Sequence, residues 1–298
     1  MARCFVTREL PGTALDRLRA AHEVEVWPGE LPPSRAELIE HAREAEGLLC
    51  LLTDAIDAEV IDACPRLRAI SNYAVGSDNI DSEAATRRGI EVGVTPDVLT
   101  ETTADLAFAL LLAAARRLPE GERDVRAGRW RTWEPRGWLG HDVHGTTLCI
   151  VGMGRIGSAV ARRAEAFSMR VVAVGHRDPL HETLAEADFV SIHCPFTDET
   201  RGLIGAAEFA AMKPTAVLVN TARGPIVQTE ALRQALTDGT IAAAALDVTD
   251  PEPLPADHPL LAAPNLLVVP HIGSATHKTR ERMADLAVDN LLAALAPN

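Results

Sequence analysis

Hydrophobic positions in the first part of the chain form short runs separated by segments with apolar residues at helical spacing. The runs predict β-strands, and the segments between them predict α-helices. Strands are expected at residues 4–7, 24–27, 47–52 and 68–70, and helices at 13–21, 35–45 and 57–63. Because strands and helices alternate, we expect a parallel sheet with helices on both faces.

The same alternation returns further along the chain. Strands are expected at residues 148–151, 170–174, 189–193, 216–220, 243–246 and 266–269, and helices at 180–187, 206–212 and 229–237. This pattern predicts a second doubly wound sheet. The length of 298 residues exceeds that of one typical domain, which also favours two domains.

Two longer helices and one irregular segment complete the pattern. Residues 101–117 have an Ala- and Leu-rich body with Thr and Asp in the first turn and two arginines at the end, and residues 274–296 are amphipathic. We expect the second of these helices to pack on the N-terminal sheet. Residues 119–145 are rich in Gly, Pro, Arg and Trp with little periodicity, which predicts a long irregular segment that is either functional or part of an interface.

A glycine-rich turn lies at the centre of this pattern. Gly152, Gly154 and Gly157 follow an apolar strand and open a helical segment. Such glycines permit a tight turn, close approach of a pyrophosphate and close helix packing, and the helix N-terminus attracts the phosphates. The turn therefore predicts a dinucleotide site, although alone it also suits other α/β domains.

Composition narrows the class of partner. The formal charge of −13, from 29 basic and 42 acidic residues, argues against nucleic acid or an anionic membrane as the main partner. Five scattered cysteines without paired spacing are typical of reduced thiols in a cytoplasmic protein. The N-terminus does not resemble a signal peptide, and the longest apolar run, residues 106–115, is too short to cross a membrane.

Several motifs together resemble one family, the D-isomer-specific 2-hydroxyacid dehydrogenases, and within it the glyoxylate and hydroxypyruvate reductase branch. The motifs lie at residues 72–81 (NYAVGSDNID), 95–106 (TPDVLTETTADL), 152–157 (GMGRIG), 219–227 (VNTARGPIV), 245–253 (ALDVTDPEP) and 270–276 (PHIGSAT). The resemblance implies a flavodoxin-like substrate domain built from residues 1–97 and 274–298. A Rossmann-type dinucleotide-binding domain, residues 98–273, would be inserted between them.

The resemblance also implies an activity, the reduction of a small 2-oxo acid to a D-2-hydroxy acid by NAD(P)H, with Arg223, Glu252 and His271 as catalytic residues. Their chemistry suits these roles. The guanidinium of Arg223 can hold a carboxylate through two hydrogen bonds, and His271 can donate a proton near neutral pH. Glu252 would orient the imidazole and stabilise its protonated form. Asp247 and Asp250 are competing partners for His271, and the motif position of Asp247 assigns it to the cofactor.

Further site residues follow from the resemblance. The substrate contacts would be the backbone N–H groups of Val75 and Gly76, with Ser274 near the pocket and Trp138 reaching from the second subunit of a homodimer. Thr103, Thr221 and Gly273 would line the nicotinamide. The other expected cofactor contacts are Gly152, Gly154, Arg155, Ile156, Gly157, His176, Arg177, Cys194, Pro195, Thr200, Ala222 and Asp247. No metal ion is expected.

The choice of nucleotide depends on the end of strand 170–174. An NAD-binding domain usually carries an acid there for the ribose 2′-hydroxyl, whereas this chain continues with Gly175, His176 and Arg177. We therefore predict NADP(H) as the preferred cofactor, with NAD(H) possible. Asp178 and a short segment between Arg177 and Leu184 count against this preference, and the two basic residues could also be solvated loop charges.

Three alternatives remain open. The substrate could be another D-2-hydroxy acid such as 3-phosphoglycerate, although no regulatory domain follows Asn298. A formate dehydrogenase is disfavoured, because formate needs no proton donor and Glu252 would then have no role. A nucleotide-sensing corepressor of the same fold is less favoured, since the chain shows no long disordered tails.

Overall fold

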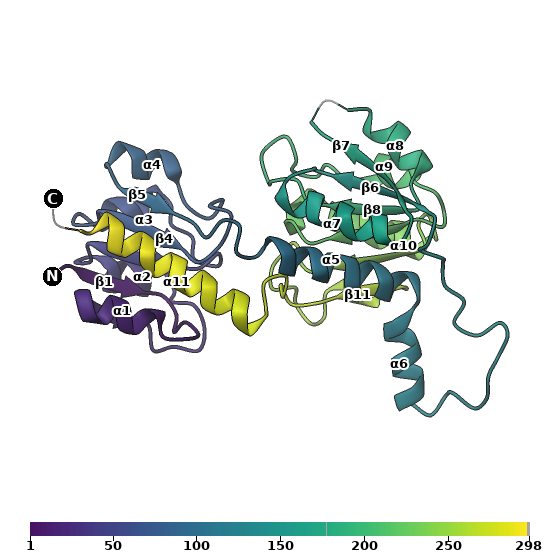
Figure 1. The fold of residues 1–298 in the computed structure, drawn as a ribbon, viewed down its shortest axis with the longest axis horizontal. Helices are drawn as coiled ribbons and strands as arrows, with labels where there is room; N and C mark the ends of the chain where they lie inside the picture. Colours follow the sequence, from purple (N-terminus) through teal and green to yellow (C-terminus); the bar gives the residue numbers. More distant parts are fainter. Residues whose placement is uncertain (177, 297–298) are drawn as a thin grey trace. The chain divides into compact units, whose positions relative to one another are not determined.

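The computed structural model describes residues 1–176 and 178–296. The chain divides into two compact units, one made of Met1–Leu99 with Ser274–Asn298 and the other of Thr100–Gly273. Both are α/β units built on parallel sheets (Figure 1). The expectation of two parallel-sheet domains is therefore confirmed.

The first unit contains a five-stranded parallel sheet in the order β2-β1-β3-β4-β5. This is the strand order of flavodoxin-like folds. The strands β3 and β4 are buried along their whole length, which explains why each is a short apolar or small-residue run. The strands are β1 (Arg3–Val6), β2 (Glu23–Val26), β3 (Gly47–Cys50), β4 (Ala69–Asn72) and β5 (Glu91–Gly93).

Helices from both ends of the chain cover this sheet. The last helix, α11, packs against α1, β3 and β4 and buries Met283, Val288 and Leu291. The C-terminal segment therefore belongs to the same hydrophobic core as the N-terminal strands. The helices are α1 (Ala14–Ala21), α2 (Arg35–Ala42), α3 (Ala58–Ala63), α4 (Ser82–Arg87) and α11 (His277–Ala294).

The second unit contains a six-stranded parallel sheet in the order β11-β10-β9-β8-β6-β7. Strand β6 pairs with β7 on one side and β8 on the other, so the strand order reverses at β6, where ligands bind in doubly wound folds. The strands are β6 (Thr147–Val151), β7 (Arg170–Val174), β8 (Phe189–Ile192), β9 (Val217–Asn220), β10 (Ala243–Leu246) and β11 (Leu266–Val268).

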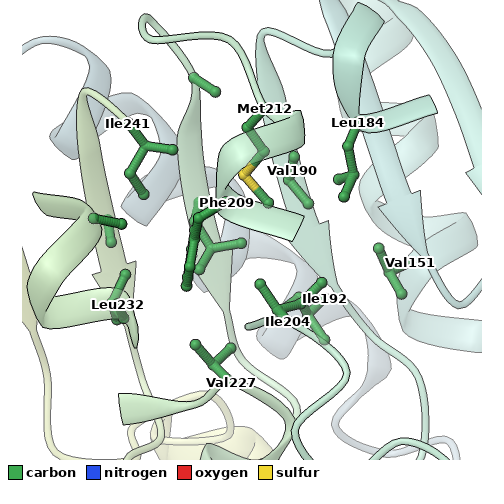
Figure 2. Close-up of a cluster of buried hydrophobic side chains, with 14 of the residues drawn as sticks. Val151, Leu184, Val190, Ile192, Ile204, Phe209, Met212, Val227, Leu232 and Ile241 are labelled. Atoms are coloured by element: carbon green, nitrogen blue, oxygen red, sulfur yellow. The ribbon is translucent and has the colours of Figure 1, made fainter. Parts of the chain in front are cut away.

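Two buried clusters hold helices on the faces of this sheet. On one face, Leu184, Phe209 and Leu232 pack on the buried strand residues (Figure 2). On the other face, Phe108 and Val160 belong to a separate cluster. Each such large apolar side chain contributes roughly 1.5–3 kcal/mol by its burial. The helices are α5 (Thr100–Ala115), α6 (Leu118–Arg126), α7 (Arg155–Ala166), α8 (Leu180–Glu186), α9 (Ala206–Ala211) and α10 (Thr229–Thr237), with 3₁₀ turns η1 (Gly224–Ile226) and η2 (Pro259–Ala262).

The expectation that residues 119–145 are irregular was wrong for their first part. Helix α6 occupies Leu118–Arg126, and the rest of the segment up to Thr146 contains no helix or strand. Pro119 lies in the first turn of α6, where a missing backbone N–H costs nothing. No residue of α6 is buried, and its two large apolar side chains, Leu118 and Val125, are exposed, so the segment lacks the dense apolar spacing of a core helix.

Two short elements of the first unit, α4 and β5, were also not expected. Elsewhere the predicted ends of helices and strands differ from the observed ends by a few residues, while β7, β10 and α10 have the predicted bounds.

Within the described residues, no helix is both long and apolar enough to cross a membrane. All five cysteines are free thiols.

Candidate active site

Most of the expected site residues of the second unit lie directly after the carboxyl ends of parallel strands. Gly152 comes directly after β6, Asp247 comes directly after β10, and Cys194 lies two residues after the end of β8. Because parallel strands end at the same edge of a sheet, these turns are neighbours. The site is therefore built from loops that a buried sheet holds in place.

The glycine turn after β6 has no space for side chains at two positions. Gly152 has φ of 97°, and a Cβ there would lie 2.5 Å from the backbone nitrogen of Cys194. A Cβ on Gly157 would lie 2.3 Å from the carbonyl oxygen of Gly152. Both contacts are far inside van der Waals distance, so the turn requires glycine.

Gly154 differs from these two glycines. It is the N-cap of α7 without a side-chain cap, and no heavy atom would lie within 4 Å of a Cβ there. Arg155 and Ile156 follow in the first turn of the helix. An open, uncapped helix start beside a glycine turn fits the pyrophosphate of a dinucleotide, because backbone N–H groups and the helix dipole favour an anion there.

Asn220 fixes the turn that carries Arg223. Its fully buried side chain donates from Nδ2 to the carbonyl of Arg223 at 2.9 Å and accepts from the N–H of Ala222 at 3.0 Å. The next residue, Gly224, lies against the backbone of Thr249, since a Cβ there would be 1.9 Å from the Thr249 oxygen. The backbone at Arg223 is therefore held on both sides, while its side chain is partly exposed.

Glu252 and His271 are in direct contact. Nδ1 of the imidazole lies 2.6 Å from Oε1 of the carboxylate, and both side chains are partly exposed, at 25% for His271 and 32% for Glu252. The other carboxylate oxygen accepts the N–H of Thr249 at 3.2 Å. With Nδ1 engaged by the carboxylate, Nε2 is the ring nitrogen left to face a ligand.

Electrostatics keep Glu252 ionised. Burial opposes its charge, but the hydrogen bond and charge of His271, the N–H of Thr249 and the charge of Arg223 together hold the pKa of Glu252 below its usual value. The charge of Arg223 is the smallest of these contributions. The strongest link among the three expected catalytic residues is therefore the contact between Glu252 and His271.

Asp247 has a separate, structural set of partners. It is buried and accepts the N–H groups of Ile272 at 2.6 Å and Gly273 at 2.8 Å. Burial is the main reason that its pKa is raised. Thr103, in the first turns of α5, donates to the carbonyl of Gly273 at 3.3 Å. Two of the expected nicotinamide-side residues, Thr103 and Gly273, are thus brought together with Asp247. The carboxylate at Nδ1 of His271 is that of Glu252 and not that of Asp247.

The loop after β8 carries three expected cofactor residues. Thr200 donates to the carbonyl of Pro195 at 2.8 Å, which closes the loop on itself. Cys194 lies against Gly152, and burial raises the pKa of its thiol. This places the β8 loop beside the glycine turn after β6.

His193 and Asn220 were missed by the sequence analysis. Nε2 of His193 lies 2.7 Å from the hydroxyl of Ser191, and Nδ1 lies 3.5 Å from the hydroxyl of Thr221. Burial lowers the pKa of His193 to about 4, so the ring is neutral. Their positions in the sequence could have indicated them, because each is a polar residue at the carboxyl end of an apolar, buried strand.

The turn after β7 contains an acid close to the strand end. Oδ2 of Asp178 accepts the N–H of Gly175 at 2.7 Å. His176 is exposed, and Arg177 lies outside the described residues. The carboxylate of Asp178 is therefore folded back to the end of β7.

The remaining expected residues lie elsewhere. Val75, Gly76 and Ser274 belong to the first unit, where Asn72 donates to the carbonyl of Gly76 at 2.8 Å and holds its loop. Trp138 donates from Nε1 to Asp124 of α6 at 2.8 Å. Across the residues that the structure describes, no group of three or more His, Cys, Asp or Glu is arranged to hold a metal ion.

Known proteins are similar to this chain in sequence and in fold. Residues 108–273 match the family described as D-isomer specific 2-hydroxyacid dehydrogenase, NAD binding domain. A glyoxylate reductase from Korarchaeum cryptofilum is 51% identical over 98% of this chain and 92% of its own length. A crystal structure of a Thermus thermophilus protein is 54% identical, with a TM-score of 0.93 over 98% of this chain and 96% of that one.

A third similar protein was crystallised with ligands. It is an NADPH-dependent glyoxylate/hydroxypyruvate reductase from Sinorhizobium meliloti in complex with NADP and malonate, 34% identical, with a TM-score of 0.85. The alignment covers 98% of this chain and 93% of that one. Similarity thus extends over both units, and a nicotinamide cofactor is expected in the second.

Proposed function

The chain belongs to the D-isomer-specific 2-hydroxyacid dehydrogenase family, and from this we propose that it is an NAD(P)H-dependent glyoxylate reductase. The contact between His271 and Glu252 is the observation that carries the proposal, because a carboxylate-oriented imidazole is a proton donor suited to carbonyl reduction. The glyoxylate reductase from Korarchaeum cryptofilum, 51% identical over 98% of this chain, supports the substrate class.

The proposed mechanism assigns one task to each catalytic residue. When bound, the reduced nicotinamide supplies the hydride that is added to C2 of the oxo acid. The carbonyl oxygen gains charge and takes a proton from Nε2 of His271, which becomes neutral. Glu252 stabilises the protonated imidazole before this transfer, and Arg223 holds the substrate carboxylate and polarises the carbonyl.

We assign the cofactor to the loops at the carboxyl edge of the second sheet. The turn of Gly152, Gly154 and Gly157 would receive the pyrophosphate, and Thr103, Thr221 and Gly273 would line the nicotinamide. The close packing of Gly152 on Cys194 supports a shared site for the β6 and β8 loops. The remaining proposed contacts are Arg155, Ile156, His176, Arg177, Pro195, Thr200, Ala222 and Asp247.

NADP(H) is the proposed preference over NAD(H). The residues directly after β7 are Gly175 and His176 rather than an acid, which suits a 2′-phosphate. The Sinorhizobium meliloti enzyme, which is described as NADPH-dependent, points the same way.

The first unit is proposed to bind substrate through the N–H groups of Val75 and Gly76, with Ser274 nearby. Hydroxypyruvate is the second candidate substrate, because the Sinorhizobium meliloti relative is described as acting on it. Both acids are small, and each presents a carboxylate next to the carbonyl that is reduced. Another D-2-hydroxy acid substrate such as 3-phosphoglycerate is the remaining alternative.

A homodimer in the cytoplasm is the proposed physiological form. Helix α6 has no buried residue, and Trp130 and Trp133 are 59% and 78% exposed. Exposed tryptophans are typical of surfaces that bind another protein, and a second copy of the chain is the proposed occupant, with Trp138 at its interface. Gel filtration with light scattering tests this, and a fully active monomer would contradict it.

The free thiols support the proposed location in the cytoplasm, which is a reducing compartment.

The decisive experiment follows the absorbance of the reduced nicotinamide. Glyoxylate and hydroxypyruvate are each assayed for reduction with NADPH and with NADH, and 3-phosphoglycerate, which is already a 2-hydroxy acid, is assayed for oxidation with NADP⁺ and with NAD⁺. We expect the highest kcat/KM for glyoxylate or hydroxypyruvate with NADPH, and a loss of turnover in His271→Ala. If no 2-oxo acid is reduced with either cofactor, or if His271→Ala keeps the wild-type rate, the proposed function is wrong.

A further inference from the structure

Thr249 holds Glu252 through two different hydrogen bonds. The backbone N–H of Thr249 donates to Oε2 of the Glu252 carboxylate at 3.2 Å, while Oε1 of the same carboxylate contacts Nδ1 of His271. The hydroxyl of Thr249 donates to the carbonyl of Pro251 at 2.8 Å. This carbonyl belongs to the peptide that leads into Glu252, so one residue holds both the carboxylate and the backbone from which the side chain extends.

The position of Thr249 is itself fixed by packing. Asp247 and Val248, which join it to the end of β10, are buried, and so is Thr249. Its carbonyl lies against Gly224, because a Cβ on that glycine would be 1.9 Å from the Thr249 oxygen. Gly224 directly follows Arg223, so Thr249 rests on the turn that carries the guanidinium and supports the loop that comes next.

Side-chain hydroxyls supply donors that this loop needs. The prolines on both sides of Glu252 have no backbone N–H to give to a neighbouring carbonyl. The carbonyl of Pro251 accepts from the Thr249 hydroxyl, and the carbonyl of Asp250 accepts from the hydroxyl of Thr229, in the first turn of α10, at 2.8 Å. The Thr249 hydroxyl thus acts on the peptide next to Glu252, and the Thr229 hydroxyl acts on the preceding peptide.

The direction of the carboxylate matters for the contact with the imidazole. A glutamate side chain is long and loses much rotamer freedom when it is held in one place, so a backbone that already points it correctly makes the contact easier to form. Although burial opposes the charge of Glu252, hydrogen bonds from His271 and from the N–H of Thr249 lower its pKa. The same residue that orients the carboxylate therefore also helps to keep it ionised.

We propose that Thr249 is a positioning residue whose hydroxyl sets the backbone from which Glu252 reaches Nδ1 of His271. It acts on proton transfer through Glu252 and touches neither substrate nor cofactor in this role. The inference rests on the proposed function as a 2-oxo acid reductase, in which His271 is the proton donor.

Three substitutions isolate the contribution of the hydroxyl. Thr249→Val removes the hydroxyl and keeps the branched shape and the backbone N–H, whereas Thr249→Ser keeps the hydroxyl and removes only a methyl group. Thr229→Val is the matched control, because it removes a hydrogen bond of the same length from the same loop without acting on the peptide next to Glu252. Thermal melts establish that each variant is folded.

Steady-state kinetics with glyoxylate and NADPH measure the effect on turnover. We expect Thr249→Val to lower kcat about tenfold and to leave the KM for glyoxylate within about twofold, because proton transfer is impaired and carboxylate binding is not. Thr249→Ser and Thr229→Val should keep kcat within about twofold of the wild type. In a Glu252→Ala background, Thr249→Val should cause less than about a twofold further loss, since no carboxylate remains to be positioned.

A second measurement needs no substrate. An imidazole N–H that is hydrogen-bonded to a carboxylate gives a downfield proton signal in NMR spectra, and the signal from Nδ1 of His271 is assigned by its loss in Glu252→Ala. We expect this signal to move upfield or disappear in Thr249→Val and to persist in Thr249→Ser and Thr229→Val.

Several results would overturn the positioning role. These are a wild-type kcat in Thr249→Val, equal losses in Thr249→Val and Thr229→Val, a tenfold loss in folded Thr249→Ser, or losses from Thr249→Val and Glu252→Ala that simply multiply. If wild-type protein reduces no 2-oxo acid while the NMR signal changes as expected, the proposed function fails and the positioning of the imidazole by Thr249 stands. If glyoxylate is reduced normally and the signal is the same in Thr249→Val, only the role of Thr249 fails.

Discussion

Nδ1 of His271 lies 2.6 Å from Oε1 of Glu252, and this contact joins the loop after β11 to the loop after β10. His271 has φ of 51°, an unusual backbone conformation for a residue with a side chain. Its N–H donates to the carbonyl of Asp247 at 2.9 Å, which helps to hold the loop. The imidazole is thus oriented from both its backbone and its Nδ1 atom.

Glu252→Gln should lower kcat about a hundredfold with little change in the KM for glyoxylate, because the protonated imidazole loses its counter-charge. Steady-state kinetics with glyoxylate measure this effect. Asp250→Asn, an exposed neighbour, is the control, and equal losses in both variants would contradict the role of Glu252.

Arg223→Lys should reduce kcat/KM for glyoxylate about a hundredfold, because an ammonium cannot make the paired hydrogen bonds of a guanidinium to a carboxylate. Nucleotide binding should be unchanged, which calorimetry with NADP⁺ verifies. Arg233→Lys serves as the control, since Arg233 forms an ion pair with Glu230 on the surface of α10. Near-normal activity in Arg223→Lys would show that paired hydrogen bonds from the guanidinium of Arg223 are not required.

Asn220→Ala should destabilise the protein by about 1–3 kcal/mol, because it leaves the N–H of Ala222 and the carbonyl of Arg223 without their buried partner. It should also raise the KM for glyoxylate, since the turn that positions Arg223 is loosened. Asn220→Asp keeps the acceptor for Ala222 but loses the donor to Arg223, so we expect it to remain defective. Thermal melts and steady-state kinetics test these effects, and a stable variant with normal KM would refute the positioning role.

How far the sequence predicts the structure depends on burial. The bounds of β10, Ala243–Leu246, were predicted because the strand is wholly apolar and fully buried. Helix α6 was not, because none of its residues is buried and only Leu118 and Val125 are large apolar residues, which is too sparse a pattern to predict a helix. Hydrophobic pattern thus reports only those elements that contribute to a core.

In the candidate site, too, some features were expected from the sequence and others were not. Arg223, Glu252 and His271 were predicted as catalytic residues from motif positions along the chain, and this assignment stays a prediction. Side-chain direction is not encoded in spacing, so neither the fold of Asp178 back to Gly175 nor the double hydrogen bond of Asn220 could be predicted. Both contacts join residues two or three positions apart, and other turn conformations with the same sequence would not form them.

His193 should make the stability of the protein pH-dependent below neutrality. Its folded-state pKa is about 4, below the unfolded value near 6.5, so the unfolded chain binds a proton more readily. The stabilisation is therefore complete above about pH 6.5 and is lost as the pH falls towards 4, by at most about 3 kcal/mol. Chemical denaturation between these pH values should show a smaller decline in His193→Gln than in the wild type. The exposed His144 gives a control, His144→Gln, that should retain the wild-type slope.

Gly152→Ala and Gly154→Ala should fail in different ways, although both alter the same turn. A Cβ at position 152 meets the backbone of Cys194 at 2.5 Å in a residue with φ of 97°, so we expect a loss of more than about 2 kcal/mol of stability. At Gly154 no atom lies within 4 Å of the added Cβ, so the variant should fold normally. Its methyl group would instead obstruct the pyrophosphate and weaken NADP⁺ binding about tenfold or more. Thermal melts and calorimetry separate the two effects, and a Gly154→Ala variant with wild-type affinity would place the pyrophosphate elsewhere.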